Sequence, residues 1–589
     1  MPALVAALAL AAAVPARAQA GSDACRNGVI SEIFVDNGSV FDVGGDDLDR
    51  RFGWAYRSAN RIHVRTRESV IRRELLFAVG DCYVPALLED SERILRSLSF
   101  IADADVFGVR QPDGSQHVVV ETRDEWSVRL EPQFDSDEGG VAITGLELRE
   151  DNLLGTGQHV SAYFKESQGE RVYGAAVGTR QLLGTRLDAE LSVARTPVGV
   201  SVVQRLAYPF RGENGRWAFR QEIEHQERNF IIFVPDAGAD GGVRRRYFEE
   251  ERRSFDVGTV MRLGRRGQLT LFGVALAGEW TEYPRDYLSV DGGGDRPAMR
   301  QVIPEEPERP VTGLDTISSV RVVFLAGQRN VRFQRRRALD VVRGTEDVRL
   351  GVEAEVGIGR SLAAFSDDDD LLVDLGFSVA SAPVRGVLAG VSARAEGRRV
   401  YGAEELQWRN LFGQADAWAY WRPSDASRHT VVAAATVVGG WRTMVPFQLT
   451  MGNRAGLRGL PTHAWPGERR VVASLEHRMY LGWPYPRLFD LGTAVFVDAG
   501  KMWAGGDTFG VNSPVEASVG FGLRAAFPPG SRRTYRMDVA VPVTDALSAG
   551  NVVVTFGLGQ AIGRGRQDDP QLRRSSRRTL SASLFSFPN

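Results

Sequence analysis

An arginine and an aspartate, forty residues apart, could form an ion pair that holds a loop in place. Arg458 lies with Gly459 in the glycine-rich segment Gly452–Pro461, between two strand-like regions. Asp498 lies in Phe496-Val-Asp-Ala-Gly500, at the end of a strand-like segment. A guanidinium offers two parallel N–H donors to one carboxylate, which positions a loop as well as binding it. On spacing alone, an ordinary loop charge and a strand-end turn residue explain the pattern more simply, so the pair is a hypothesis.

Motifs for catalysis, metal binding or cofactor binding are missing from the sequence. It contains no Gly-x-Ser-x-Gly elbow, no Walker A loop and no complete GxGxxG, and its seven histidines are scattered without metal-ligand spacing. The acidic run Ser366–Asp370 lacks the spaced ligands and glycine turn of a calcium loop, which favours a solvated loop. We therefore expect no enzymatic activity, no cofactor and no metal.

The two cysteines, Cys25 and Cys82, are a candidate disulfide. In an exported protein an isolated pair is more often a disulfide than a metal site. Two unpaired thiols remain the alternative. Export itself is predicted by residues 1–20, an apolar run ending in Ala18-Gln-Ala20, which is typical of a cleaved signal peptide. An N-terminal membrane anchor is the alternative there, but the run is short and rich in alanine.

Composition favours a membrane barrel over a nucleic-acid-binding protein or a helical membrane protein. The net charge of the 589 residues is −2, which gives no reason to expect nucleic acid as a partner. The mean hydropathy is −0.20. That value is too polar for membrane helices but ordinary for a barrel, whose strands expose only alternate residues to lipid.

Residues 54–125 are predicted to form a small α/β domain, preceded by an extension over residues 21–53. Alternation predicts strands over Asn60–Val64, Ala102–Arg110 and His117–Thr122, and helical spacing predicts helices over Arg67–Phe77 and Val84–Leu98. The extension contains one short apolar piece, Ile30–Val35, and little other pattern.

From residue 126 to residue 562, segments of about nine to twelve residues alternate between apolar and polar side chains. A sheet in a membrane must close, because an open edge in lipid leaves backbone groups unsatisfied. In Arg536–Pro542, Met537 and Val539 share a face that suits lipid, and Asp538 lies on the opposite, lumen-facing side. We interpret residues 235–253 as a long polar insertion and residues 563–589 as a flexible tail.

Several of these segments resemble one protein family. Leu457-Arg-Gly-Leu460 resembles the Val-Arg-Gly-Phe/Tyr motif in the sixth extracellular loop of the BamA-type superfamily, also called the bacterial surface antigen family. Phe496–Gly500 resembles its Phe-x-Asp-x-Gly strand motif, and Glu150–Gly157 resembles the segment near its first strands. Arg67–Gly80 with Leu87–Phe100 resembles a POTRA domain. The chain departs from the family in having leucine on both sides of Arg458-Gly459 and one POTRA-like domain only.

The resemblance implies a barrel of about sixteen antiparallel strands in the bacterial outer membrane, with the POTRA domain in the periplasm. It also implies that Arg458 pairs with Asp498 and that the first and last strands meet at a weak seam. A further acidic lumen residue can join the pair, and Asp538 is the candidate because of the face on which it lies. Members insert proteins into outer membranes or translocate them. The partners implied are the lipid bilayer, unfolded or secreted client proteins and periplasmic accessory proteins.

The leading hypothesis is therefore insertion or translocation of proteins. A client strand would pair with the POTRA domain along His117–Thr122, and the seam between residues 126–134 and 551–562 would open for it. Dedicated export of one partner protein, lipid or glycan is a second hypothesis. A channel or structural barrel without client activity is the third.

Overall fold

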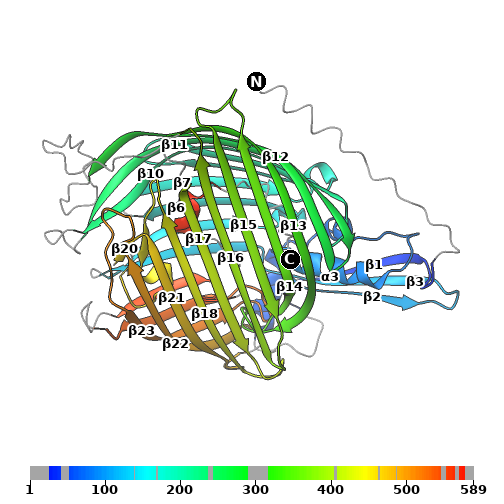
Figure 1. Cartoon of the computed structure of the whole chain (residues 1–589). Coiled ribbons are helices and arrows are strands. Elements are labelled where there is room, and N and C mark those ends of the chain that lie inside the picture. The colour runs from blue at the N-terminus through cyan, green and yellow to red at the C-terminus, as the bar shows by residue number, and fades with distance from the viewer. Residues whose placement is uncertain are drawn as a thin grey trace, which may run out of the picture.

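The alternating part of the sequence forms a closed antiparallel barrel of 20 strands in the described part of the chain, and a small α/β domain precedes it (Figure 1). The computed structural model describes residues 25–41, 52–137, 140–167, 170–235, 243–288, 316–402, 408–461, 465–485, 487–544, 552–563 and 569–577. The predicted signal peptide lies outside these residues.

The barrel strands follow one another around the wall in sequence order, each pairing with the next. They are β4 (Val128–Asp137), β5 (Gly140–Glu150), β6 (Gln158–Ser167), β7 (Glu170–Thr179), β8 (Asp188–Arg195), β9 (Val200–Tyr208), β10 (Trp217–Pro235), β11 (Val243–Arg265), β12 (Gln268–Leu288), β13 (Ile317–Arg337), β14 (Thr345–Ser361), β15 (Asp370–Ser381), β16 (Val387–Val400), β17 (Trp408–Trp421), β18 (His429–Trp441), β21 (Arg469–Tyr480), β22 (Asp490–Trp503), β23 (Glu516–Ala526), β24 (Tyr535–Pro542) and β25 (Val553–Leu558).

Alternation along each strand separates an outer from an inner face. In β22, Val495 and Val497 are 50% and 41% exposed on the outside, whereas Asp498 is fully buried on the inside. The same period places Asp538 of β24 on the inner face, as predicted. Apolar side chains therefore cover the outside, where lipid would lie, and polar side chains line the lumen.

The predicted number of about sixteen strands is wrong. Strands β10 to β13 are 19 to 23 residues long, well beyond the roughly 9–11 that cross a bilayer. The predicted polar insertion over residues 235–253 is largely strand, because β11 begins at Val243.

The segment with Arg458 joins the fifteenth and sixteenth strands of the wall, not the eleventh and twelfth that a sixth loop would join. The four strands beyond the expected sixteen therefore come before the Arg458 segment in the chain.

The small domain is a three-stranded sheet covered by helices. Its elements are β1 (Ile30–Gly38), α1 (Gly53–Ile62), α2 (Glu68–Glu74), α3 (Pro85–Ser97), β2 (Ile101–Arg110) and β3 (Gln116–Asp124). Ile30, Ile71, Leu95 and Val118 are almost completely buried between the sheet and the helices. Cys25 and Cys82 form the predicted disulfide, with Cα atoms 5.2 Å apart, and it ties the start of β1 to the loop before α3.

Three predictions about the small domain are wrong. The domain begins before residue 54, because β1 of the predicted extension pairs in parallel with β3. Residues 60–64, predicted to be a strand, form the end of α1 and the loop after it. An alternation of only five residues does not distinguish a strand from a helix. The sheet order is β1-β3-β2, so β3, which contains His117–Thr122, is the central strand and not an edge.

Ion pairs attach the small domain to one end of the barrel, which we call the near end; the opposite end is the far end. Arg96 of α3 contacts both carboxylate oxygens of Asp347 on β14, at 2.8 and 3.0 Å. Glu74 of α2 pairs with Arg211, between β9 and β10. Asp90 of α3 lies 2.8 Å from Arg266, between β11 and β12. These contacts lie along a wide arc of the near end, so the domain is held in one orientation.

No helix among the described residues has the length and apolar character of a membrane-spanning helix.

Candidate functional site

The segment between β18 and β21 starts at the far end and folds back into the lumen. Its short strands β19 (Leu449–Met451) and β20 (Trp465–Gly467) form an antiparallel hairpin. Leu457 and Leu460, which flank Arg458-Gly459, are fully buried in one apolar cluster with this hairpin. We call residues 442–468 the inner loop. Its apolar packing fixes the stretch of chain that presents Arg458 to the wall.

Arg458 makes a two-pronged contact with Asp498 of β22. The Nε and Nη2 atoms of Arg458 lie 2.8 Å from Oδ2 and Oδ1 of Asp498, and the Arg458 backbone N–H also donates to Oδ2 at 3.2 Å. The guanidinium carbon lies 3.4 Å from the centre of the Phe496 ring. Because both charged groups are almost completely buried, this contact is short, directional and shielded from water.

Further charged residues on the neighbouring strands surround this pair. Arg458 Nη1 lies 2.7 Å from Glu476 Oε2 and 3.5 Å from Asp538 Oδ2. Arg478 lies 2.7 Å from Glu476, and Arg524 lies 2.6 Å from Asp538. We call this set the lumen network: Arg458, Glu476, Arg478, Asp498, Arg524 and Asp538. It spans β21 to β24: Arg458 binds the inner loop to β21, β22 and β24, and Arg524 of β23 joins through Glu476 and Asp538.

The structure brings the three predicted residues, Arg458, Asp498 and Asp538, together. Sequence reasoning missed Glu476, which contacts Arg458 as closely as Asp498 does. A signal was available, because Glu476 and Arg478 lie two residues apart on the alternating strand β21 and so share its lumen face.

Gly459 allows the inner loop to approach the wall closely. Its φ is +90°, a left-handed conformation that side chains disfavour. A Cβ atom there would lie 3.0 Å from the Ser518 side chain and 3.2 Å from that of Ala540. Any larger residue would move the inner loop away from β23 and β24, and Arg458 with it.

The C-terminal segment, predicted to be a flexible tail, lies inside the lumen where it is described (Figure 1). The short helix α4 (Pro570–Ser575) begins at Asp569, whose side chain caps it and pairs with Arg470 of β21. Gln571 exchanges hydrogen bonds with Thr450 of the inner loop, at 3.0 and 2.7 Å. The prediction of a flexible tail is therefore wrong for residues 569–577, which join the inner loop to the wall.

Arg577 anchors the end of this segment on the side of the wall away from the lumen network. Its Nε lies 2.6 Å from Glu279 of β12, and its backbone N–H donates to Glu396 of β16 at 2.8 Å. Glu250 of β11 lies 3.7 Å from the same guanidinium. Contacts with β11, β12 and β16 at one end and with the inner loop at the other mean that the tail crosses the lumen.

The first and last strands of the wall meet at a seam. With six residues, β25 is the shortest of the 20 described barrel strands. The rings of Phe134 on β4 and Phe556 on β25 are 4.7 Å apart. On the lumen side, the Thr555 hydroxyl donates to the side-chain oxygen of Asn453 in the inner loop, at 2.8 Å. The inner loop therefore contacts the strand that closes the barrel.

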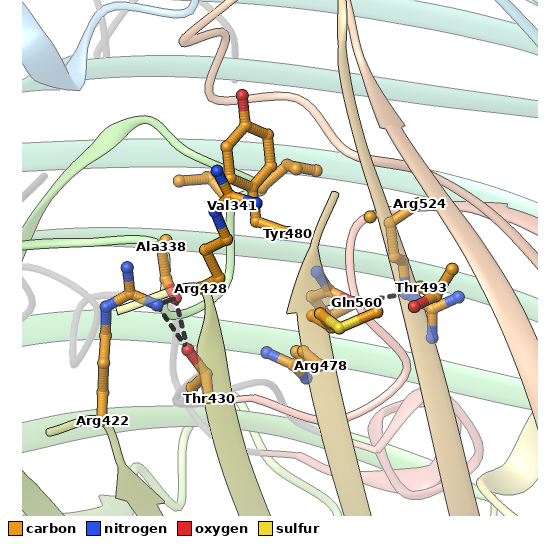
Figure 2. Close-up of a pocket in the computed structure, with 13 residues that line it drawn as sticks. Ala338, Val341, Arg422, Arg428, Thr430, Arg478, Tyr480, Thr493, Arg524 and Gln560 are labelled. Atoms are coloured by element: carbon orange, nitrogen blue, oxygen red, sulfur yellow. Dashed lines mark hydrogen bonds between the residues drawn. The ribbon is translucent and has the colours of Figure 1, made fainter. Parts of the chain in front are cut away.

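A pocket lined by four arginines opens beside the lumen network at the near end (Figure 2). Arg422 donates to the Thr430 hydroxyl at 2.8 Å, and Arg524 donates to the side-chain oxygen of Gln560, just beyond β25, at 2.8 Å. Arg428 and Arg478 complete the set, and no carboxylate lines the pocket. The near end of the lumen thus presents guanidinium groups, some of which also belong to the lumen network.

One family model matches part of the chain. Residues 450–562 match the Omp85 superfamily domain, a segment that begins in the inner loop and ends after β25. No curated protein matches the chain. Among solved structures, BamA from Haemophilus ducreyi lacking POTRA domains 1–3 is 13% identical, with a TM-score of 0.36, and the match covers 90% of this chain and 84% of that one. CdiB from Escherichia coli is 12% identical, with a TM-score of 0.43 and coverage of 90% and 76%.

Proposed function

Because the chain carries an Omp85 superfamily domain over residues 450–562, we propose that it inserts or translocates proteins at the bacterial outer membrane. The observation that carries this proposal is that the matched segment contains both the lumen network and β25, the short strand of the seam. Residues 1–20 would direct export, and the small domain would lie in the periplasm.

The action proposed is mechanical and not enzymatic. The seam would part between β25 and β4, exposing the backbone N–H and C=O groups of both strands as a template for a client strand. The lumen network would keep the inner loop and strands β21 to β24 in place while this happens. Thr555, which contacts the inner loop through Asn453, would link the two regions.

The small domain would receive the client at one of its two open edges, β1 or β2, since β3 is central. Helix side chains already occupy part of each edge. Arg72 donates to the Ile33 carbonyl on β1, and Arg96 donates to the Ala104 carbonyl on β2. The last residues of β2, Gly108–Arg110, extend beyond the contacts of α3 with Ala104 and Val106 and offer a stretch of edge for backbone pairing.

A steady channel is a poorer fit to the lumen. The inner loop and the C-terminal segment both occupy it, and the ion pairs of Arg458 and Arg577 hold them to opposite sides of the wall. Such an interior favours passage through the seam over passage through an open pore. Dedicated export of one protein, lipid or glycan uses the same architecture and differs only in the client.

The proposal is tested by outer-membrane proteomics after depletion of the protein, with complementation by variants. The test variant carries Phe134→Cys and Phe556→Cys, joined by a short thiol crosslinker across the seam. The matched control carries Val497→Cys and Val519→Cys, which face each other on the outside of β22 and β23, away from the seam.

Depletion should lower the amounts of other outer-membrane proteins, and the crosslinked seam should fail to restore them while the control succeeds. Loss of many barrels indicates general assembly, and loss of one or a few proteins indicates a dedicated pathway. An unchanged proteome, or full rescue by the crosslinked seam, would refute the proposed protein client or the proposed route.

A further inference from the structure

Two turns at the near end share a sequence and a backbone conformation. Leu153-Leu-Gly155 joins β5 to β6, and Leu182-Leu-Gly184 joins β7 to β8. In both, the second leucine is left-handed, with φ 52° and ψ 27° for Leu154 and φ 52° and ψ 29° for Leu183. A left-handed leucine is strained. Because the strain occurs twice, the surrounding contacts must determine the direction in which each leucine points.

The polar side of each turn binds the small domain. The Asn152 side chain donates to the Thr66 hydroxyl at 2.8 Å, and the Gly155 carbonyl accepts the Arg67 N–H at 2.9 Å. In the other turn, the Gln181 side chain donates to Glu74 of α2 at 2.8 Å. Both turns are therefore clamped against the start and end of α2.

The described part of the chain leaves much of the apolar side of each turn uncovered. Leu154 is 64% exposed and Leu183 is 94% exposed, and Leu153 is also exposed. Leucine side chains placed this far into water by a strained backbone indicate an apolar surrounding that the isolated chain does not supply. The outer face of the neighbouring strands continues this exposed apolar surface, through Leu148 of β5 and Leu191 of β8.

The wall is also short here. Strands β5, β6, β7 and β8 have 11, 10, 10 and 8 residues. A strand of about 9–11 residues only just crosses the hydrocarbon region of a bilayer. The turns at the ends of these strands must then lie at the boundary of the membrane, whereas the longer strands β10 to β13 have residues to spare.

We propose that Leu154 and Leu183 insert into the membrane leaflet on the side of the small domain, at the boundary between lipid headgroups and acyl chains. The partner is a phospholipid surface. The two turns then have one face in lipid and one face on α2, so they pin the small domain to the membrane beside the first strands of the barrel. This inference rests on the proposal that the barrel spans a membrane, but it needs no client.

Nitroxide labels test the inference in the full-length protein in phospholipid vesicles. Because both native cysteines are in the disulfide, Leu154→Cys and Leu183→Cys can each be labelled alone. Collision rates of the label with oxygen, which concentrates in lipid, are compared with those with a water-soluble nickel chelate. Leu191→Cys, on the outer face of β8, is the lipid control, and Pro112→Cys, in the exposed β2–β3 turn, is the water control.

At both leucine positions, the oxygen-to-nickel ratio should exceed that of Pro112→Cys several-fold and approach that of Leu191→Cys. A ratio equal to that of Pro112→Cys would place the leucines in water and overturn the inference. Low collision rates with both reagents would also overturn it, because another protein would then cover the turns. A low ratio at Leu191→Cys itself would instead count against a membrane-spanning barrel, so failure of the inference and failure of the proposed location are distinguishable.

Discussion

The wall of the barrel is built differently at the lumen network and at the seam. At the lumen network, β21 to β24 carry buried charges that are shared among several partners and held to the inner loop by Arg458. At the seam, the six-residue β25 meets β4, with one aromatic pair on their side chains. Removing one partner of a buried ion pair costs about 3–5 kcal/mol, whereas an ordinary backbone hydrogen bond contributes about 0.5–1.5 kcal/mol.

This difference indicates a division of roles. The lumen network resists separation, because a strand that leaves it exposes unpaired buried charge. A six-residue strand can separate at the cost of a few hydrogen bonds that water or a client strand would replace. The two regions are nevertheless neighbours, since the inner loop contacts Thr555 of β25. Variants that weaken one region and not the other can therefore test the comparison.

The largest effect is expected from Arg458→Ala. Without the guanidinium, Asp498, Glu476 and Asp538 keep their burial but lose a shared countercharge, which should destabilise the barrel by about 3–5 kcal/mol. Unfolding in urea, followed by the loss of heat-modifiable migration on gels, measures this change. The stability of the Arg458→Lys barrel should lie between that of Arg458→Ala and that of the wild type, because an ammonium keeps the charge but not the two-pronged geometry.

The matched control for Arg458→Ala is Arg428→Ala. Arg428 lines the neighbouring pocket, but its exposed side chain lies outside the lumen network. Its loss should leave the barrel as stable as the wild type. Equal stability of the Arg458→Ala and Arg428→Ala proteins would mean that the inner loop is held by apolar packing alone and that the comparison with the seam fails.

A smaller effect is expected from Arg577→Ala. This change removes the contacts of the C-terminal segment with Glu279 and Glu250, which keep Arg252 and Arg228 as ion-pair partners. It should therefore weaken the attachment of the segment by about 1–3 kcal/mol only. The segment would then leave the lumen for part of the time, and ion conductance in planar bilayers should rise. Arg573→Ala is the control, because Arg573 lies on the exposed side of α4. Conductance that stays at the wild-type level would show that the segment does not limit passage.

The barrel and its faces were predictable because alternation is a local signal. A two-residue period places Asp538 on the lumen side whatever its neighbours are, and the family motifs pointed to Arg458 and Asp498. Which strands become neighbours, and in which register, depends on the whole closed sheet. The contact between Arg458 and Glu476 therefore could not be predicted with confidence, although Glu476 was visible as a lumen-facing charge.

The errors share a physical cause. Residues that look like solvent-exposed charges in a linear sequence become buried when a closed wall supplies partners far along the chain. Asp370, interpreted as part of a solvated acidic run, is fully buried and contacts Arg321 and Arg398. Arg577, interpreted as part of a flexible tail, pairs with glutamates roughly 180–330 residues away. The strand β1 was missed for a similar reason, because its partner β3 is remote in sequence.

The smallest effect is expected at the contact of the small domain with the near end, where Glu74 pairs with Arg211. Burial alone would raise the pKa of Glu74, but Arg211, Arg180 and the Gln181 hydrogen bond together hold this pKa below its usual value of 4.5. Because the pKa is lowered only when the domain is docked, the ionised carboxylate stabilises docking above about pH 4.5, and this contribution is lost as the pH falls through the lowered pKa.

Distances between spin labels on α1 and on the near end of the barrel, measured from pH 7 to pH 3, follow the docking. The wild-type distance distribution should broaden at the acidic end of this range. The distribution of the Glu74→Gln protein should already be broader than that of the wild type at neutral pH. Glu89→Gln, which alters an exposed pair with Arg266, should leave the wild-type pH profile unchanged. If Glu74→Gln keeps the wild-type profile, the small domain is held to the barrel by its other contacts. The near end would then resemble the lumen network, with its shared partners, more than the seam.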